Sequence, residues 1–199
     1  MKNLIVNLWK GYKPSDLIGV NMIVMVAGVY GVGKSTVSNK LSEDFNIKFH
    51  SASDLIKAEK GYSTWDKDKK TDQVKNNQEY LIKAINKMSG DDFLLDGHFC
   101  LINKNGNIEN IDFSTIKKLH INAVLLLKEN PGIISRRLFD RDKVLWDESF
   151  ISKMQESEES QAKLFTHENN IPFSSMYVNN YNAIKKFITK SFYIRKENE

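Results

Sequence analysis

Cysteine and long hydrophobic runs are scarce in the sequence, and each scarcity limits the kind of protein that it encodes. Cys100 is the only cysteine among 199 residues, so no intrachain disulfide and no thiolate metal cluster can form. The longest apolar runs, residues 22–28 and 123–127, are far shorter than the ~20 residues that a membrane-spanning helix needs. We therefore expect a cytoplasmic protein without a membrane partner.

Several functional signatures are also missing. No signal peptide is expected, because Lys2, Asn7 and Lys10 interrupt the apolar residues at the start of the chain. The Asn-Lys-x-Asp signature with which GTPases read guanine is absent, as is the signature of ABC-type ATPases. The chain is also shorter than a typical AAA+ module with its helical lid. A net charge of +4, spread along the sequence, gives no clear indication of a nucleic-acid partner.

The composition fits one α/β domain with a short addition at its N-terminus. Hydrophobic residues make up 41% of the chain and charged residues 27%, as in ordinary globular proteins of this size. The first strand-like run begins only at Met22, so residues 1–21 look like an extension of the domain formed by residues 22–199. Leu4, Ile5 and Leu8 can share a helical face that docks on the domain or on a partner. A start codon assigned upstream of the true one explains the same residues equally well.

The most informative segment is residues 28–35, GVYGVGKS, a full match to the phosphate-binding loop G-x-x-x-x-G-K-[ST]. Its glycines let the backbone turn tightly and direct successive N–H groups toward an anion, and the following helix adds the positive end of its dipole. Lys34 can reach the terminal phosphates, and Ser35 offers a hydroxyl to Mg²⁺. An accidental glycine turn is the alternative, but a strand pattern before the loop and a helix pattern after it favour ATP binding. The expected nucleotide-binding residues of the loop are Gly28, Gly31, Val32, Gly33, Lys34, Ser35 and Thr36.

Strand and helix patterns alternate along the rest of the chain. Strands are expected at residues 22–27, 47–50, 93–96, 122–127 and 176–178, and helices at residues 34–41, 73–88, 131–142, 148–166 and 183–194. Ser53 or Asp54 is expected to cap a further short helix that runs to about Lys60, before a polar loop or flap at residues 61–77. This alternation predicts a three-layer α/β fold, with helices on both faces of a parallel sheet and the ligand at the carboxyl ends of the strands.

Phosphoryl transfer needs a carboxylate for the metal and cations for the transferring group in addition to the loop. Asp96 ends an apolar strand and is the expected second ligand of Mg²⁺ beside Ser35, the alternative being a carboxylate that caps the next turn. Arg137 and Arg141 are four residues apart and share a helical face, so we expect them to form a lid over the triphosphate. The alternative is an ordinary basic helix end that the helix dipole favours.

Two further residues are candidates for contact with a substrate. His98 lies two residues after Asp96, and Asp54 follows the second predicted strand, so both are expected near the mouth of the site. A histidine in such a place more often forms hydrogen bonds in a turn than transfers a proton. The expected catalytic set is therefore Lys34, Asp96, Arg137 and Arg141.

With these motifs together, residues 22–190 resemble the archaeal-type adenylate kinases, a branch of the P-loop nucleoside monophosphate kinases. The resemblance rests on residues 32–36, on Asp96-Gly97-His98 and on residues 134–138, with weaker likeness in residues 155–161 and in Asn179-Asn180. It implies that the loop binds ATP, that a flap after the second strand holds a monophosphate, and that an arginine lid closes over both. It also implies that residues after the last strand, here Asn179, contact the adenine.

The sequence departs from that family in two places. The family places an arginine a few residues after Asp-x-His to hold the acceptor phosphate, whereas residues 101–103 offer none. Its lid is also richer in arginine than this one, where Phe139, Val144 and Leu145 occupy the corresponding stretch. Two hypotheses follow. One is an ATP-dependent kinase for a small nucleotide or nucleoside acceptor. The other is an ATP-binding or ATPase module that regulates a protein partner, with a second copy of the chain as a further candidate partner.

Overall fold

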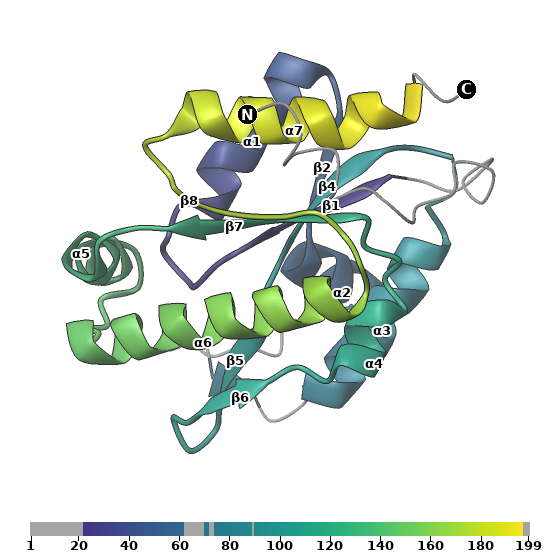
Figure 1. Ribbon diagram of the computed structural model, residues 1–199. Coiled ribbons are helices and arrows are strands. Elements are labelled where there is room, and N and C mark those ends of the chain that lie inside the picture. Colours follow the sequence, from purple (N-terminus) through teal and green to yellow (C-terminus); the bar gives the residue numbers. More distant parts are fainter. Residues whose placement is uncertain (1–21, 62–69, 72–73, 89, 197–199) are drawn as a thin grey trace.

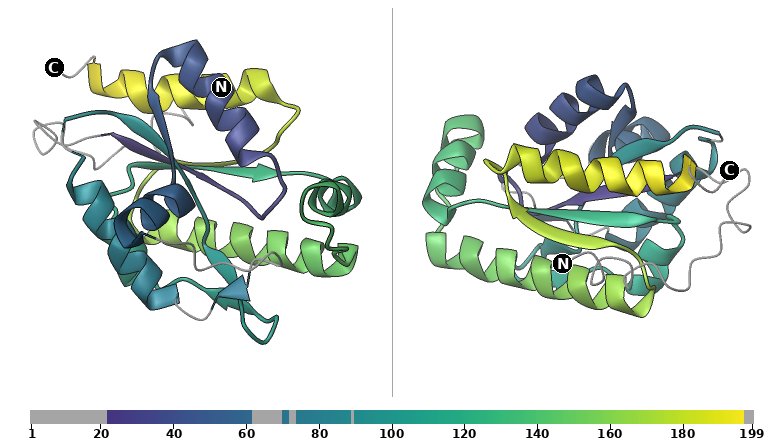
Figure 2. Two further views of the ribbon diagram at one scale, coloured as in Figure 1. Left: turned by 180° about the vertical axis from the view of Figure 1, so that it is seen from behind. Right: turned by 45° about the horizontal axis from the view of Figure 1, so that its top comes forward.

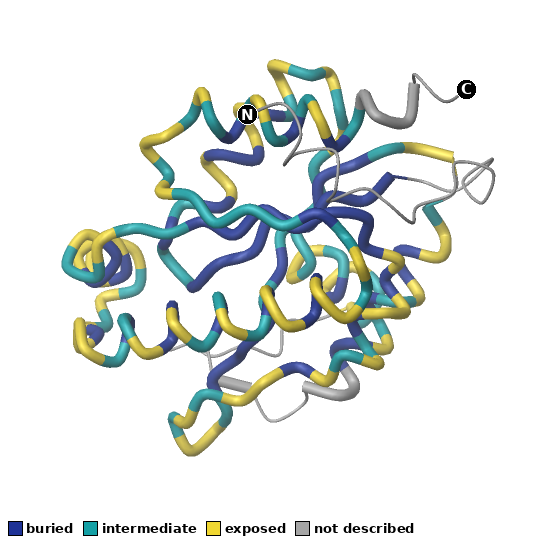
Figure 3. The backbone as a smooth tube through the Cα atoms, viewed as in Figure 1, coloured by how far each residue is buried: buried dark blue, intermediate teal, exposed yellow. Residues whose placement is uncertain are grey.

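The computed structural model describes residues 22–61, 70–71, 74–88 and 90–196 of the chain. Within these residues a central sheet lies between two layers of helices, and burial is concentrated in the sheet and in the helix faces that lie against it (Figures 1 and 3). This arrangement confirms the predicted α/β fold. None of the helices in the described residues combines the length and the apolar composition that crossing a bilayer requires.

Five parallel strands form the central sheet in the order β2-β4-β1-β7-β8. They are β1 (Ile23–Ala27), β2 (Lys48–Ser51), β4 (Phe93–Gly97), β7 (Ala123–Lys128) and β8 (Phe173–Tyr177). Every residue of β1 is buried, because its alternate side chains pack into different cores. Val24 and Val26 belong to one core, and Ile23 and Met25 belong to the other. A strand that is covered on both faces therefore has a continuous apolar sequence.

Helices cover both faces of this sheet (Figures 1 and 2). One layer consists of α1 (Lys34–Phe45) and α7 (Tyr181–Lys196), and the other of α2 (Ala52–Lys60), α3 (Val74–Asn86), α4 (Phe113–Lys117) and α6 (Glu148–Glu168). A seventh helix, α5 (Pro131–Asp142), follows β7 at its carboxyl end. Asn130 caps α5 by accepting hydrogen bonds from the N–H groups of Gly132 and Ile133, and Pro131 occupies its first turn.

A second, three-stranded sheet was not predicted from the sequence. It has the order β3-β5-β6, with β3 (Lys70–Thr71), β5 (Cys100–Asn103) and β6 (Ile108–Asn110). The turn-rich residues 103–107 connect β5 to its antiparallel neighbour β6. The side chain of Asn103 accepts hydrogen bonds from the N–H groups of Asn105 and Asn107, which closes this turn. β5 begins three residues after the end of β4, so it extends the chain from the main sheet toward α4 and α6.

Two details of the predicted elements were wrong. The cap of α2 is Ser51, whose hydroxyl accepts a 3.4 Å hydrogen bond from the Asp54 N–H, and not Ser53 or Asp54. The last strand begins at Phe173 and not at Met176, because its sequence FSSMY has no continuous apolar run to mark the start. Most of the predicted flap at residues 61–77 and all of the extension at residues 1–21 lie outside the described residues.

Candidate active site

The backbone of the phosphate-binding loop accepts only glycine at its tightest positions. Gly28 has a φ of 142°, and a Cβ there would lie 2.7 Å from the carbonyl oxygen of Leu127. Gly31 has a φ of 75°, and a Cβ there would lie 2.9 Å from the Cγ of Leu138. Both contacts are shorter than real side chains tolerate, so the loop is pressed between β7 and α5. Val32, which follows Gly31, is fully buried and anchors the loop in the core.

Lys34 lies at the start of α1, and its ammonium group is turned back onto its own loop. Its Nζ donates hydrogen bonds to the carbonyl oxygens of Gly28 at 2.7 Å and Val29 at 3.1 Å. The side chain is only 7% exposed, so these carbonyl groups compensate a buried charge. A bound polyphosphate offers a stronger partner in the same space, and Lys34 can reach it by exchanging these carbonyl oxygens for phosphate oxygens.

The register of the sheet brings Asp96 to this loop. In the β1–β4 pair, Val26 lies opposite Asp96 and Ala27 opposite Gly97, so the end of β4 meets the start of the loop. Asp96 Oδ1 lies 3.7 Å from Lys34 Nζ, and Asp96 Oδ2 accepts a 3.5 Å hydrogen bond from Ser35 Oγ. Residues that are 61 positions apart in the sequence thus meet at one point, as the alternating pattern predicts.

Ser35 and Asp96 together fit the outer ligands of Mg²⁺. The described residues hold no group of three or more His, Cys, Asp or Glu side chains that could bind a metal ion alone. Mg²⁺ that accompanies a nucleotide does not need such a group, because phosphate oxygens and waters complete its octahedron. One hydroxyl and one carboxylate, already within hydrogen-bond distance, match that requirement. Their role as magnesium ligands is taken up below as a proposal.

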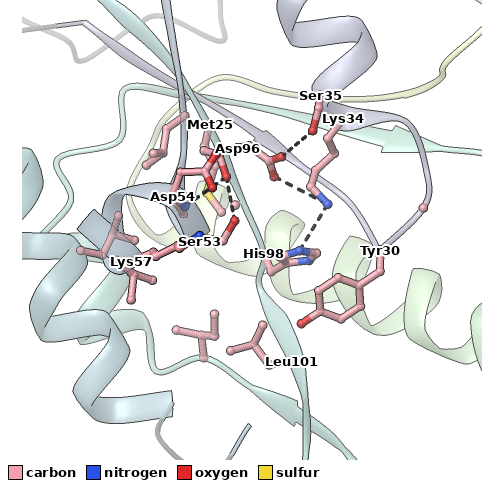
Figure 4. Close-up of a pocket in the computed structure, with 18 of the residues that line it drawn as sticks. Met25, Tyr30, Lys34, Ser35, Ser53, Asp54, Lys57, Asp96, His98 and Leu101 are labelled. Atoms are coloured by element: carbon pink, nitrogen blue, oxygen red, sulfur yellow. Dashed lines mark hydrogen bonds and ion pairs between the residues drawn. The ribbon is translucent and has the colours of Figure 1, made fainter. Parts of the chain in front are cut away.

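His98 connects Lys34 to a buried glutamate. Its Nε2 lies 3.3 Å from Lys34 Nζ, and its Nδ1 lies 3.4 Å from Glu158 Oε1 (Figure 4 shows the Lys34 contact). Burial, and after it the charge of Lys34, hold the pKa of His98 below its ordinary value. The neutral ring then accepts from the ammonium at Nε2 and carries its proton on Nδ1, toward the carboxylate. His98 therefore acts here as a hydrogen-bonding residue that holds Lys34 in place.

Glu158 of α6 is a site residue that the sequence did not reveal. It is 1% exposed, and its Oε2 accepts hydrogen bonds from the N–H groups of Phe99 at 2.7 Å and Cys100 at 2.6 Å. These bonds fix the turn between β4 and β5 that carries His98. Glu158 lies on the buried face of α6 together with Met154 and Ala162. A carboxylate at that helical spacing could have indicated a buried functional residue, but α6 has many other polar residues that hide the pattern.

Tyr30, inside the loop, packs against His98 and Trp146 at ring-centroid distances of 4.5 and 6.2 Å. Its hydroxyl is buried, and no residue in the described part of the chain forms a hydrogen bond with it. Burial, with smaller contributions from Glu158 and Asp96, raises the pKa of Tyr30 above its ordinary value. The phenol is therefore neutral at neutral pH, and its hydroxyl brings a desolvation cost without a compensating bond.

We expect Tyr30→Phe to stabilise the protein. The substitution removes a buried hydroxyl that has no partner in the described residues and keeps the ring contacts, so the gain should be on the order of 1 kcal/mol. For a chain of this length such a gain raises the melting temperature by roughly 2–4 °C. Thermal unfolding without nucleotide measures the effect, with Tyr177→Phe, which alters an exposed ring, as the control. A clear fall in melting temperature would mean that the hydroxyl has a bonding partner after all.

The arginines of α5 lie on the open side of the loop. Arg137 Nη1 donates to the carbonyl oxygens of Val32 at 3.0 Å and Gly31 at 3.4 Å, while Nη2 pairs with Glu129 at 3.1 Å. Arg141 pairs with its neighbour Asp142 at 2.7 Å. Both side chains line the same cavity as Lys34. α5 is held by Ile134 and Leu138, which are buried against the loop.

One cavity of about 580 Å³ connects these groups. Its lining comes from the loop, Asp96 and α5 and from residues of α2, α3, β5 and α4. Figure 4 shows Lys34, Ser35 and Asp96 together, with Leu101 of β5 at a distance from them. Asp54 lines the cavity from the first turn of α2 and is exposed to it. Asn179 follows β8, is exposed and does not line this cavity. Thr36 lines it beside Ser35.

The fold and the loop define a P-loop nucleotide-binding domain. Within that class, residues 27–150 match the family described as an AAA domain (AAA_17), and the chain belongs to this family. No curated protein matches the sequence.

Solved structures share the fold. A gluconokinase from Sinorhizobium meliloti 1021 aligns with a TM-score of 0.50 and 16% identity, over 89% of this chain and 94% of that chain. A shikimate kinase from Bacteroides thetaiotaomicron aligns with a TM-score of 0.50 and 9% identity, over 85% of this chain and 97% of that chain. Such identities show a common fold alone. The finer resemblance to adenylate kinases stays a prediction.

Proposed function

We propose that the protein is an ATP-dependent kinase that transfers the γ-phosphoryl group of ATP to a small nucleotide or nucleoside acceptor. The observation that carries the proposal is the cavity, which does not end at the phosphate-binding loop but continues past Asp54 to a second wall. An ATPase needs room only for a water molecule beside the γ-phosphate. A cavity of about 580 Å³ with two distinct ends has room for a second substrate. The two solved structures that share the fold are a gluconokinase and a shikimate kinase, which agrees with this proposal.

The proposed roles follow from the geometry. The loop N–H groups and Lys34 bind the β- and γ-phosphates, and Arg137 moves from the Gly31 and Val32 carbonyl groups to the phosphoryl group in transfer. Ser35 and Asp96 hold Mg²⁺, which neutralises phosphate charge when it is bound. The bond between the γ-phosphorus and the bridging oxygen of ADP breaks as the acceptor oxygen bonds to phosphorus. Asp54 orients that oxygen and accepts its proton.

A screen for ATP-dependent ADP release tests the proposal. With nucleosides and nucleoside monophosphates added singly, we expect one acceptor to raise ADP release at least tenfold above the rate with ATP alone, because acceptor binding completes the site and excludes water. If no acceptor accelerates turnover while ATP still binds, the kinase proposal is wrong.

The proposal also predicts a specific effect of Arg137 in the same screen. In Arg137→Ala the rate of ADP release in the presence of the acceptor should fall by roughly 10²-fold or more, because the charge of Arg137 acts on the transferring phosphoryl group. Arg136→Ala is the matched control, since Arg136 lies on the same helix but does not line the cavity. Equal losses in both variants would indicate a general effect on α5 and contradict a role for Arg137 in transfer.

A further inference from the structure

We infer that the acceptor is a nucleoside without a phosphate group, whose base lies on the apolar wall of the cavity against Gln78 and whose sugar hydroxyl faces Asp54. The inference rests on the proposed kinase function and narrows its acceptor class. It depends on three independent properties of the far end of the cavity: its charge, its apolar wall and the amide of Gln78 in that wall.

The charge at this end does not suit a monophosphate. The whole sequence has four arginines, of which Arg136, Arg137 and Arg141 belong to α5 and Arg195 to the end of α7. None of them lies in α2, α3, α4 or β5, which form the far wall. Among the described residues, the charged side chains that line this far end of the cavity are Asp54 and Lys57.

These two residues carry one positive and one negative charge, which cancel each other. A nucleoside monophosphate brings a further charge of about −1.5 to −2, and kinases hold such a group with bidentate arginines. Lys57 alone cannot offset that charge beside Asp54, which lies one helical turn away on the same cavity wall (Figure 4). A neutral acceptor avoids this repulsion.

The wall itself is apolar and is built from four elements. Its residues are Ile56, Leu81, Leu101, Ile111, Ile116 and Leu119. Each of them is at most 5% exposed, so this wall of the cavity is part of the hydrophobic core. A planar base gains free energy by covering such a surface, at ~25 cal/mol per Å² of apolar area removed from water. A phosphate there would lose its hydration without compensation.

Gln78 supplies the polar group that forms hydrogen bonds with the base. It lines the cavity from α3 and is 8% exposed. Its side-chain amide carries two N–H donors and a carbonyl acceptor, and a ligand in the cavity can bond to them. The edge of a nucleobase presents the complementary donor and acceptor pair. A ligand with such an edge therefore satisfies Gln78, whereas a plain hydrocarbon does not.

Asp54 supplies the contact for a hydroxyl. Its carboxylate forms no hydrogen bond or ion pair with the described residues, and it lines the cavity together with Lys57 (Figure 4). A free carboxylate accepts a hydrogen bond from an alcohol and repels a phosphate. Its place between the apolar wall and the loop is where the hydroxyl of a nucleoside meets the γ-phosphate.

The test compares matched pairs with the full-length protein. Adenosine, guanosine, cytidine, uridine and thymidine are each assayed for ADP release beside their 5′-monophosphates, and binding is measured by calorimetry with a non-hydrolysable ATP analogue. We expect one nucleoside to give at least tenfold higher kcat/KM than its monophosphate. A monophosphate that is the better acceptor overturns the inference and leaves the kinase proposal standing. If ATP binds and no compound of either kind accelerates turnover, both are wrong.

Two variants test the assigned contacts. Gln78→Leu should raise KM for the nucleoside at least fivefold with kcat changed less than twofold, because it removes a contact to the base alone. Asp54→Asn should lower kcat at least tenfold, while Glu59→Gln, on the same helix but paired with Lys87 outside the cavity, should not. An unchanged KM in Gln78→Leu, with its melting temperature preserved, contradicts the placement of the base.

Discussion

Lys34→Ala should abolish the stabilisation that ATP gives to the protein. At an ATP concentration 100-fold above Kd, wild-type protein should gain about 2.7 kcal/mol of stability. The alanine variant should gain almost nothing, because the ammonium that faces the terminal phosphates is lost. Its stability without nucleotide should change less, since water entering the open cavity can bond to the Gly28 and Val29 carbonyl groups that Lys34 now contacts. Thermal unfolding with and without ATP and Mg²⁺ measures both quantities.

The matched control for this prediction is Lys40→Ala. Lys40 lies on the same helix, but its ammonium stacks on the ring of Tyr181, away from the cavity. Its variant should keep the full ATP-induced shift. Equal shifts in wild type and Lys34→Ala would contradict the assignment of the loop as an ATP site.

Asp96→Asn should reduce kcat by about 10²- to 10³-fold while changing ATP affinity only a few-fold. The substitution keeps the shape of the side chain and an oxygen for Ser35, but it removes the charge that we assign to Mg²⁺. That charge matters most when phosphate charge redistributes in the transition state. Higher Mg²⁺ concentrations should be needed for half-maximal activity.

Asp91→Asn provides the control for Asp96. Asp91 precedes the same strand and pairs with Lys48 on the surface, outside the cavity. Its variant should retain wild-type kcat. An unchanged kcat in Asp96→Asn would contradict the metal role and would favour the alternative that Asp96 caps a turn.

The parts of the site that local sequence specifies were predictable. The loop is one continuous octamer, and its glycines are required by local steric limits. A Cβ at Gly28, for example, would lie 2.7 Å from the carbonyl oxygen of Leu127. Asp96 was identified because an apolar run ends on it, and parallel strands align their carboxyl ends. The order of strands and helices followed from their alternation.

The parts that depend on distant contacts were not predictable. β3 has two residues, too few for any periodic pattern, and the turn before β5 is held by Glu158 of α6, which is far away in the sequence. Ser51, Ser53 and Asp54 are all good capping residues, and only the path of β2 selects Ser51. The far wall of the cavity joins α2, α3, β5 and α4, whose residues are far apart in the sequence.

The most direct test of the kinase proposal follows the γ-phosphate itself. With γ-³²P-labelled ATP, Mg²⁺ and the acceptor found by the screen, we expect the label to appear on a small organic product in a one-to-one ratio with ADP. Arg137→Ala should reduce that product while Arg136→Ala should not. Label that appears only as inorganic phosphate, at a rate that no acceptor changes, would contradict the account and indicate an ATPase that acts on a protein partner.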